Sequence, residues 1–262
     1  MDIQAKECGS APGIMLAGRG CVDTVFRQAV NIRMPGDMCL SLVDSKLDSA
    51  PNRIILQSGV LDRLSIHPGD EIQVLEDKLC HRDFTISYLP VQDLTKPISA
   101  PTLSTIAEIR EVLSSGRGAC LNYLGMDKGG ILEQRVASLA QSLASDQSAG
   151  FALVGLGAGF TPAGDDVLTG YCILAYRLGW LDLAWHQQIV ERAFTDSTIL
   201  SATALYFAGR GKGQGYLENV LHALIAPIQL KSAGKTLIHE VGSTSGSDLL
   251  LGVLIACQHS LL

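Results

Sequence analysis

The residues best suited to chemistry lie in one short segment, residues 155–166, which reads GLGAGFTPAGDD. Glycine adopts positive φ values readily and lets the backbone approach a ligand closely. We expect Thr161 to cap a helix that has Pro162 at its first position, because both residue types are favoured there. Asp165 and Asp166 then fall in the first turn, where adjacent side chains point about 100° apart. One acid is therefore expected to face a site while the other pairs elsewhere.

This segment does not match the common nucleotide-binding loops. A dinucleotide fingerprint needs a third glycine where Phe160 stands, and no Gly-Lys-Ser/Thr sequence follows, as a P-loop requires. Two interpretations remain open. The segment is a structural strand–turn–helix corner, or it binds a small anion through the backbone at Gly157, Gly159, Thr161 and Gly164.

The helix start is repeated 82 residues later. Residues 164–173 and 246–255 share the pattern G-x-D-x-L-x-G-x-x-I, which pairs Asp166 with Asp248. Helix N-termini carry unpaired N–H groups and a partial positive charge, so two facing starts form an anion or substrate site. The acids can instead hold a cation or a substrate amide, or they only cap buried helices. The second start is formed by Thr244, Ser245 and Gly246.

A second glycine-rich segment, residues 209–215, carries Arg210 and Lys212 between two expected helices. On a mobile loop these cations can close over a phosphate or carboxylate. The alternative is a solvated connector without a binding role.

Composition excludes several classes of protein. With 47% apolar and 18% charged residues the chain is not intrinsically disordered, and a net charge of −6 without a basic run argues against a nucleic-acid partner. Its apolar tracts are shorter than the roughly 20 residues that span a bilayer, so no membrane partner is expected. Seven cysteines, an odd number with no CxxC pair, and an N-terminus without an apolar signal region indicate a cytoplasmic protein with reduced thiols.

The elements that position these motifs form two parts of an α+β protein. Residues 12–89 are expected to form a β-rich domain, a barrel or sandwich, and residues 90–103 a proline-punctuated linker. Residues 104–262 show helical periodicity and carry both copies of the repeat. The expected strands cover residues 13–17, 24–33, 38–43, 53–57, 71–75 and 83–88.

Residues 155–166 resemble the G-x-G-P-G-x-T-P-S-G-D-D signature of a bacterial family, the AllH-type subunits of oxamate carbamoyltransferase. Residues 201–205 and 242–252 also resemble segments of that family, and the likeness is weaker in the β-rich part. Three positions depart from the family pattern. Ala158 replaces a proline, Ala163 a serine and Ser243 a histidine.

The resemblance implies a role in anaerobic allantoin degradation. The family's enzyme converts oxalurate and phosphate into oxamate and carbamoyl phosphate, and the AllH-type chain works with two other subunits. The expected ligands are therefore small anions, namely oxalurate, oxamate, phosphate and carbamoyl phosphate.

The residues themselves suggest how such a site would work. Asp165, Asp166 and Asp248 are the expected catalytic acids. Asp166 and Asp248 hold the carbamoyl –NH₂ or a Mg²⁺ ion, and the sequence indicates no other cofactor. The helix starts stabilise the tetrahedral oxyanion, and Arg210 and Lys212 neutralise phosphate. Two alternatives stay open: a non-catalytic scaffold or regulatory subunit, and a stand-alone Mg²⁺-dependent transferase or hydrolase.

Overall fold

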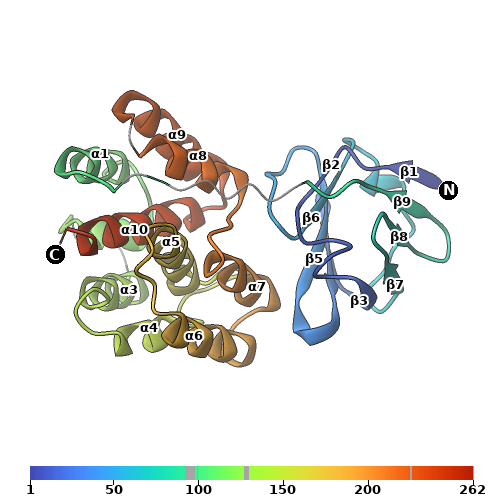
Figure 1. Cartoon of the computed structure of the whole chain (residues 1–262), viewed down its shortest axis with the longest axis horizontal. Helices are drawn as coiled ribbons and strands as arrows, with labels where there is room; N and C mark the ends of the chain where they lie inside the picture. Colours follow the sequence, from blue (N-terminus) through green and yellow to red (C-terminus); the bar gives the residue numbers. More distant parts are fainter. Residues whose placement is uncertain (92–97, 99, 127–129, 225, 262) are drawn as a thin grey trace. The chain divides into compact units, whose positions relative to one another are not determined.

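The computed structural model describes residues 1–91, 98, 100–126, 130–224 and 226–261. The chain divides into two compact units, Met1–Leu94 and Thr95–Leu262, each with its own core (Figure 1). Residues 92–97 and 99 of the expected linker lie outside the described residues.

The first unit is one nine-stranded sheet, over its described residues, that curls into a half-barrel. Its strand order is β1-β9-β8-β7-β3-β4-β5-β6-β2, with β1–β9 and β5–β6 parallel and the other pairs antiparallel. The strands are β1 Asp2–Gln4, β2 Glu7–Cys8, β3 Gly18–Val25, β4 Ala29–Arg33, β5 Cys39–Asp44, β6 Arg53–Leu56, β7 Glu71–Val74, β8 Lys78–Cys80 and β9 Thr85–Ser87.

Two strand predictions are wrong in this unit. Residues 13–17 form a turn, because Gly13 has a φ of +76° and the N–H groups of residues 14–16 all donate to the Ala11 carbonyl. Residues 24–33 are not one strand but the end of β3 and all of β4. A hairpin joins them, and the N–H of Phe26 donates to the carbonyl of Ala29 across it (2.7 Å).

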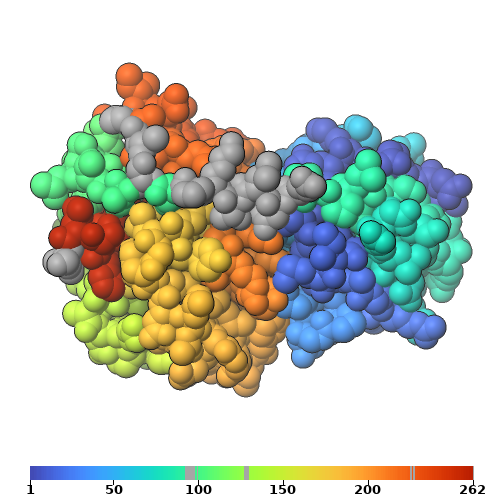
Figure 2. All heavy atoms as spheres, in the orientation of Figure 1, coloured from blue at the N-terminus to red at the C-terminus, as the bar shows by residue number. Residues whose placement is uncertain are grey.

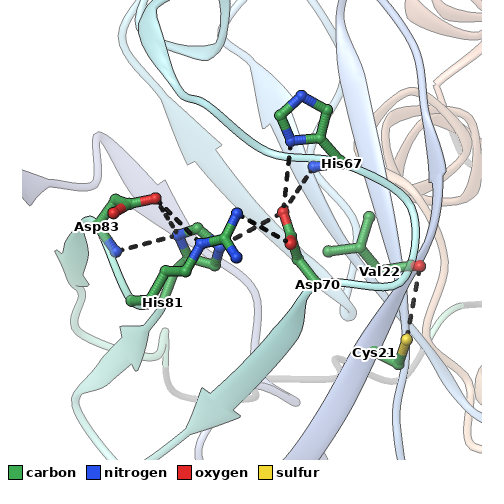
Figure 3. A network of polar contacts seen from close by, with 7 residues as sticks. Cys21, Val22, His67, Asp70, His81 and Asp83 are labelled. Atoms are coloured by element: carbon green, nitrogen blue, oxygen red, sulfur yellow. Dashed lines mark hydrogen bonds and ion pairs between the residues drawn. The ribbon is translucent and has the colours of Figure 1, made fainter.

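A polar network fixes the turn that leads into β7 (Figure 3). The Asp70 carboxylate accepts the backbone N–H of His67 at 2.7 Å, and this hydrogen bond is the main cause of its lowered pKa. The buried ring of His81 lies next to it, with Nε2 3.5 Å from the Asp70 carboxylate, while the N–H of Asp83 donates to Nδ1 at 3.3 Å. The network therefore ties the turn to the β8–β9 hairpin.

The second unit is helical throughout its described residues, and two of its helices are almost wholly buried. α5 is buried from Gly164 to Ala175 and α10 from Gly246 to Cys257, as expected for helices that are apolar on all sides. On the face shown in Figure 2, α10 reaches the surface near its C-terminal end. The helices are α1 Leu103–Leu113, α2 Ala119–Tyr123, α3 Ile131–Ser142, α4 Ser148–Leu153, α5 Ala163–Arg177, α6 Leu183–Asp196, α7 Ile199–Ala208, α8 Gly215–Ala223, α9 Pro227–Glu240 and α10 Ser245–His259.

The sequence repeat is also a repeat in three dimensions. A Cβ atom at Gly170 would overlap the Leu249 carbonyl oxygen, and a Cβ at Gly252 would overlap that of Val167. These contacts are reciprocal, because Gly170 and Val167 occupy the same repeat positions as Gly252 and Leu249. α5 and α10 are therefore packed backbone to backbone about an approximate twofold axis.

Each repeat also packs its first glycine in the same way. A Cβ at Gly164 would overlap the Leu153 carbonyl of α4, and a Cβ at Gly246 would overlap the Leu237 carbonyl of α9. No helix among the described residues is long and apolar enough to cross a membrane.

Candidate functional site

The N-termini of α5 and α10 meet through their side chains. The Thr161 and Ser245 hydroxyls are 2.9 Å apart, which joins the two helix starts. The prediction that Thr161 caps α5 is wrong. Pro162 is the capping residue and Ala163 the first helical residue, and neither Pro162 nor Thr244 makes a side-chain cap. The Thr161 hydroxyl is instead directed across the repeat axis.

Asp165 connects α5 to its neighbours. Its Oδ1 accepts the Gly155 N–H at 2.8 Å, and its Oδ2 accepts a short hydrogen bond from the Ser197 hydroxyl. Burial raises the pKa of Asp165, and these hydrogen bonds oppose the shift. Both carboxylate oxygens are thus engaged within the protein, and the side chain fixes the glycine-rich loop and the start of α7.

The equivalent position in α10 is Ser247, and it makes the equivalent contact. Its hydroxyl oxygen accepts the backbone N–H of Arg117 at 3.0 Å. Arg117 precedes α2 and stands between two glycines. In each repeat, therefore, the residue before the Asp of the shared pattern (Asp165 before Asp166, Ser247 before Asp248) fixes a loop against the helix start.

Asp166 and Asp248 are different, because both are buried and incompletely bonded. Their exposed fractions are 8% and 0%. Oδ2 of Asp166 and both carboxylate oxygens of Asp248 make no hydrogen bond of normal geometry with the described residues. A buried carboxylate oxygen without a partner loses its hydration without compensation, so such groups in native proteins call for an explanation.

Burial raises the pKa of both acids. The pKa of Asp166 lies well above its usual range, chiefly because of burial, and the charge of Asp248 adds to the shift. The Ser245 and Thr161 hydroxyls oppose it. Burial raises the pKa of Asp248 to about 8, against the smaller opposing effect of the nearby Thr244 hydroxyl and Ala119 N–H.

The glycine-rich loop lies against the start of α5. A Cβ at Gly157, where φ is +147°, would overlap the backbone of Ala163 and Pro162. Gly159 has a φ of +91° and open space on its Cβ side. The Phe160 carbonyl accepts the Thr198 hydroxyl at 2.7 Å, so the exposed tip of the loop is fixed to the start of α7.

The structure does not bring Arg210 and Lys212 to these acids. The carbonyl of Gly211, between them, accepts two hydrogen bonds from Arg177, at 2.8 and 2.6 Å. Arg177 is the last residue of α5, about 20 Å along the helix from its first turn. The Arg210 guanidinium lies 3.5 Å from the centre of the Tyr206 ring. This placement favours the connector interpretation of the loop.

Comparison with known protein families identifies both parts of the chain. The model of the oxamate carbamoyltransferase subunit AllH matches residues 153–257. The model of the AllH family N-terminal domain matches residues 5–92, and together the two cover most of the chain. The chain belongs to the AllH family. No solved structure matches it.

The AllH match contains both copies of the repeat and therefore every acid of the candidate site. It begins at the end of α4 and ends inside α10, and it leaves out the α1–α2 region that contains Arg117. Arg117 also lies outside the sequence motifs that point to the site. The available signal was the Gly116-Arg117-Gly118 sequence, in which glycines on both sides permit a close approach of the backbone.

The AllH-family site offers a metal ion two carboxylates, Asp166 and Asp248. Among the described residues, no group of three or more His, Cys, Asp or Glu side chains is close enough to hold a metal. The free oxygens of Asp166 and Asp248 are hard ligands of the type that Mg²⁺ accepts, and Mg²⁺ often uses one or two carboxylates together with substrate phosphates. The residues present therefore fit a Mg²⁺ ion only if the substrate supplies further ligands.

Proposed function

We propose that this AllH-family chain contributes the carbamoyl-binding site of an oxamate carbamoyltransferase. The observation that carries the proposal is the pair of buried, incompletely bonded acids, Asp166 and Asp248, at adjoining helix N-termini. Substrates would be oxalurate with phosphate, or oxamate with carbamoyl phosphate in the reverse direction. The enzyme would act in the cytoplasm, in allantoin degradation, together with two other subunits.

The carbamoyl group is complementary to this site. Its –NH₂ donates two hydrogen bonds, which the free oxygens of Asp166 and Asp248 can accept. Its carbonyl oxygen becomes an oxyanion when phosphate attacks, and the partial positive charge of the α5 and α10 N-termini stabilises such an anion. A carbamoyl group thus supplies donors for the unbonded carboxylate oxygens and a developing negative charge for the two helix N-termini.

The raised pKa of Asp248 is suited to the proton transfer in this reaction. A phosphate oxygen attacks the carbamoyl carbon of oxalurate, the C–N bond to the oxamate nitrogen breaks, and that nitrogen takes up a proton. The proton comes from the hydrogen phosphate. An acid with a pKa of about 8 can transfer this proton near neutral pH, because both of its protonation states are accessible there.

Two further parts of the proposal follow from the same residues. Asp165 acts as a positioning residue, since both of its oxygens are bonded within the protein. A Mg²⁺ ion, if one takes part, would be held by Asp166 and Asp248 and would polarise the phosphate.

The alternative function is a non-catalytic scaffold, in which partner chains bind the substrates.

Calorimetric titration of the full chain with oxamate and with carbamoyl phosphate tests the proposal. We expect the wild type to bind at least one of them, and Asp166→Asn and Asp248→Asn to weaken binding roughly tenfold or more. Arg210→Ala and Lys212→Ala are controls that leave the affinity unchanged, because these residues lie at the far end of α5.

Two results would contradict the proposal. Wild-type chain that binds neither compound would favour the scaffold. Binding that survives in both aspartate variants, with an unchanged fold by circular dichroism, would place the ligand elsewhere.

A further inference from the structure

We propose that Arg117 orients the substrate by binding its anionic end on the Asp248 side of the site. This inference rests on the proposed function and adds to it a specificity-determining residue. The expected ligand is a small molecule that carries an amide next to a carboxylate or phosphate.

The two halves of the site have the same framework. In one half the Gly155 N–H donates to Asp165 (2.8 Å), and in the other the Arg117 N–H donates to Ser247 (3.0 Å). Asp165 and Ser247 occupy the same repeat position. Gly155 and Arg117 are thus structural counterparts, but one has no side chain and the other has a guanidinium group.

The backbone around Arg117 is held close to Asp248. A Cβ at Gly118 would lie 3.6 Å from Oδ1 of Asp248 and 3.1 Å from the Thr244 side chain. A Cβ at Gly116 would lie 2.9 Å from the Ser247 hydroxyl oxygen. Larger residues on either side would push the loop away, so the two glycines place Arg117 at the edge of the acid pair.

The guanidinium group of Arg117 is available to a ligand. The side chain is exposed and has no ion-pair partner among the described residues, whereas Arg177, Arg192 and Lys231 of the same unit pair with acids. Arg117 is therefore not used to neutralise the acid pair.

An anionic substrate needs such a cation here. In their ionised forms Asp166 and Asp248 repel a carboxylate or phosphate, and the charge of Glu133 adds to the negative field at Asp248. A planar guanidinium binds either anion through two parallel hydrogen bonds. The loop of the other half, residues 155–160, contains no charged residue. This asymmetry directs the anionic end toward Arg117 and leaves the amide between the acids.

A comparison of oxamate with oxamide, its neutral diamide, tests the assignment on the full chain. We expect the wild type to bind oxamate more tightly, and Arg117→Ala to weaken oxamate binding about tenfold or more while oxamide binding is unchanged. Arg117→Lys should keep part of the preference, because it retains the charge without the paired hydrogen bonds. Arg27→Ala, which removes another exposed arginine outside this unit, should have no effect.

The outcomes separate this inference from the proposed function. If Arg117→Ala binds oxamate and oxamide with the same ratio as the wild type, Arg117 does not orient the substrate, although the acid site stands. If the wild type binds neither compound, the acid site itself is wrong and this inference fails with it. A structural role of Arg117 would lower the affinity for both compounds together and would also contradict the inference.

Discussion

Asp248 is fully buried, yet its two carboxylate oxygens have no hydrogen bond of normal geometry within the described residues. Its neighbour Ser247 accepts a hydrogen bond from Arg117, and its repeat counterpart Asp166 has one such unbonded oxygen instead of two. Burial of an ionised, unpaired carboxylate is costly, so the protein favours the protonated form of Asp248. Asp248 is therefore expected to lower the free energy of unfolding, while its unbonded oxygens remain free to bind a ligand.

The pKa of Asp248 predicts a pH-dependent stability. The value is about 8 in the folded chain and about 3.9 in an unfolded one, so the folded state binds more protons between these limits. The free energy of unfolding should therefore fall as pH rises from about 4 to about 8, and level off above that. Asp248→Asn removes this contribution, so the variant should be more stable than the wild type at pH 8, by up to several kcal/mol, and no more stable at pH 4.

Urea unfolding of both proteins at pH 5, 6.5 and 8, followed by far-UV circular dichroism, measures this difference. Asp62→Asn, at an exposed position of the first unit, is the control and should parallel the wild type. An Asp248→Asn variant that is destabilised equally at every pH would show that Asp248 is ionised and satisfied in the folded chain.

At the scale of elements, the α5–α10 pair depends on two glycines. Glycine inside a helix normally costs about 1 kcal/mol relative to alanine, so its presence at both repeat positions needs a reason. That reason is the close approach of the two backbones, in which Gly170 faces the Leu249 carbonyl and Gly252 the Val167 carbonyl. The same packing sets the separation of the two helix starts and hence of Asp166 and Asp248.

Gly170→Ala and Gly252→Ala are each expected to destabilise the second unit by about 3 kcal/mol, because the added methyl group must push a helix backbone away. Both variants should also weaken oxamate binding, since the helix starts separate. The measurements are urea unfolding and calorimetric titration.

Gly234→Ala, inside α9, is the matched control for these two variants. Its Cβ would lie 3.1 Å from a methyl group of Val112, which can shift, and not against a carbonyl oxygen. We expect a change within about 1 kcal/mol. If all three variants behave alike, close backbone packing is not what retains the repeat glycines.

At the scale of the whole molecule, the described acids of the site all belong to the second unit. The first unit has a separate core and is matched by its own family model. In the proposed enzyme the chain binds the carbamoyl group, and partner subunits complete the catalytic site. In this proposal the second unit binds the substrate, and the first unit has no part in the acid site.

This arrangement predicts that turnover depends on the partners. Oxamate-dependent loss of carbamoyl phosphate should occur with the chain purified together with its co-purifying subunits, and should be absent with the chain alone, although the chain alone binds oxamate. Treatment with EDTA, followed by addition of Mg²⁺, tests the ion in the same assay. Turnover by the isolated chain would favour the stand-alone transferase instead.

Much of the organisation of this protein was predictable from local sequence. The change from alternating to helical periodicity indicates an α+β chain, because side-chain spacing reflects the secondary structure directly. The repeated glycine and aspartate positions indicate two equivalent helix starts, and the motif of residues 155–166 indicates the family. Each of these features is contained within a short stretch of chain.

Only the tertiary structure decides which of these residues meet. It separates Arg210 and Lys212 from the acids, since their loop lies beside the C-terminal end of α5, and it brings Arg117 to Ser247 across 130 residues of sequence. It also directs Thr161 to Ser245, away from a capping role. Contacts of this kind depend on how helices pack through their buried faces, and periodicity shows that a face is buried without showing which helix covers it.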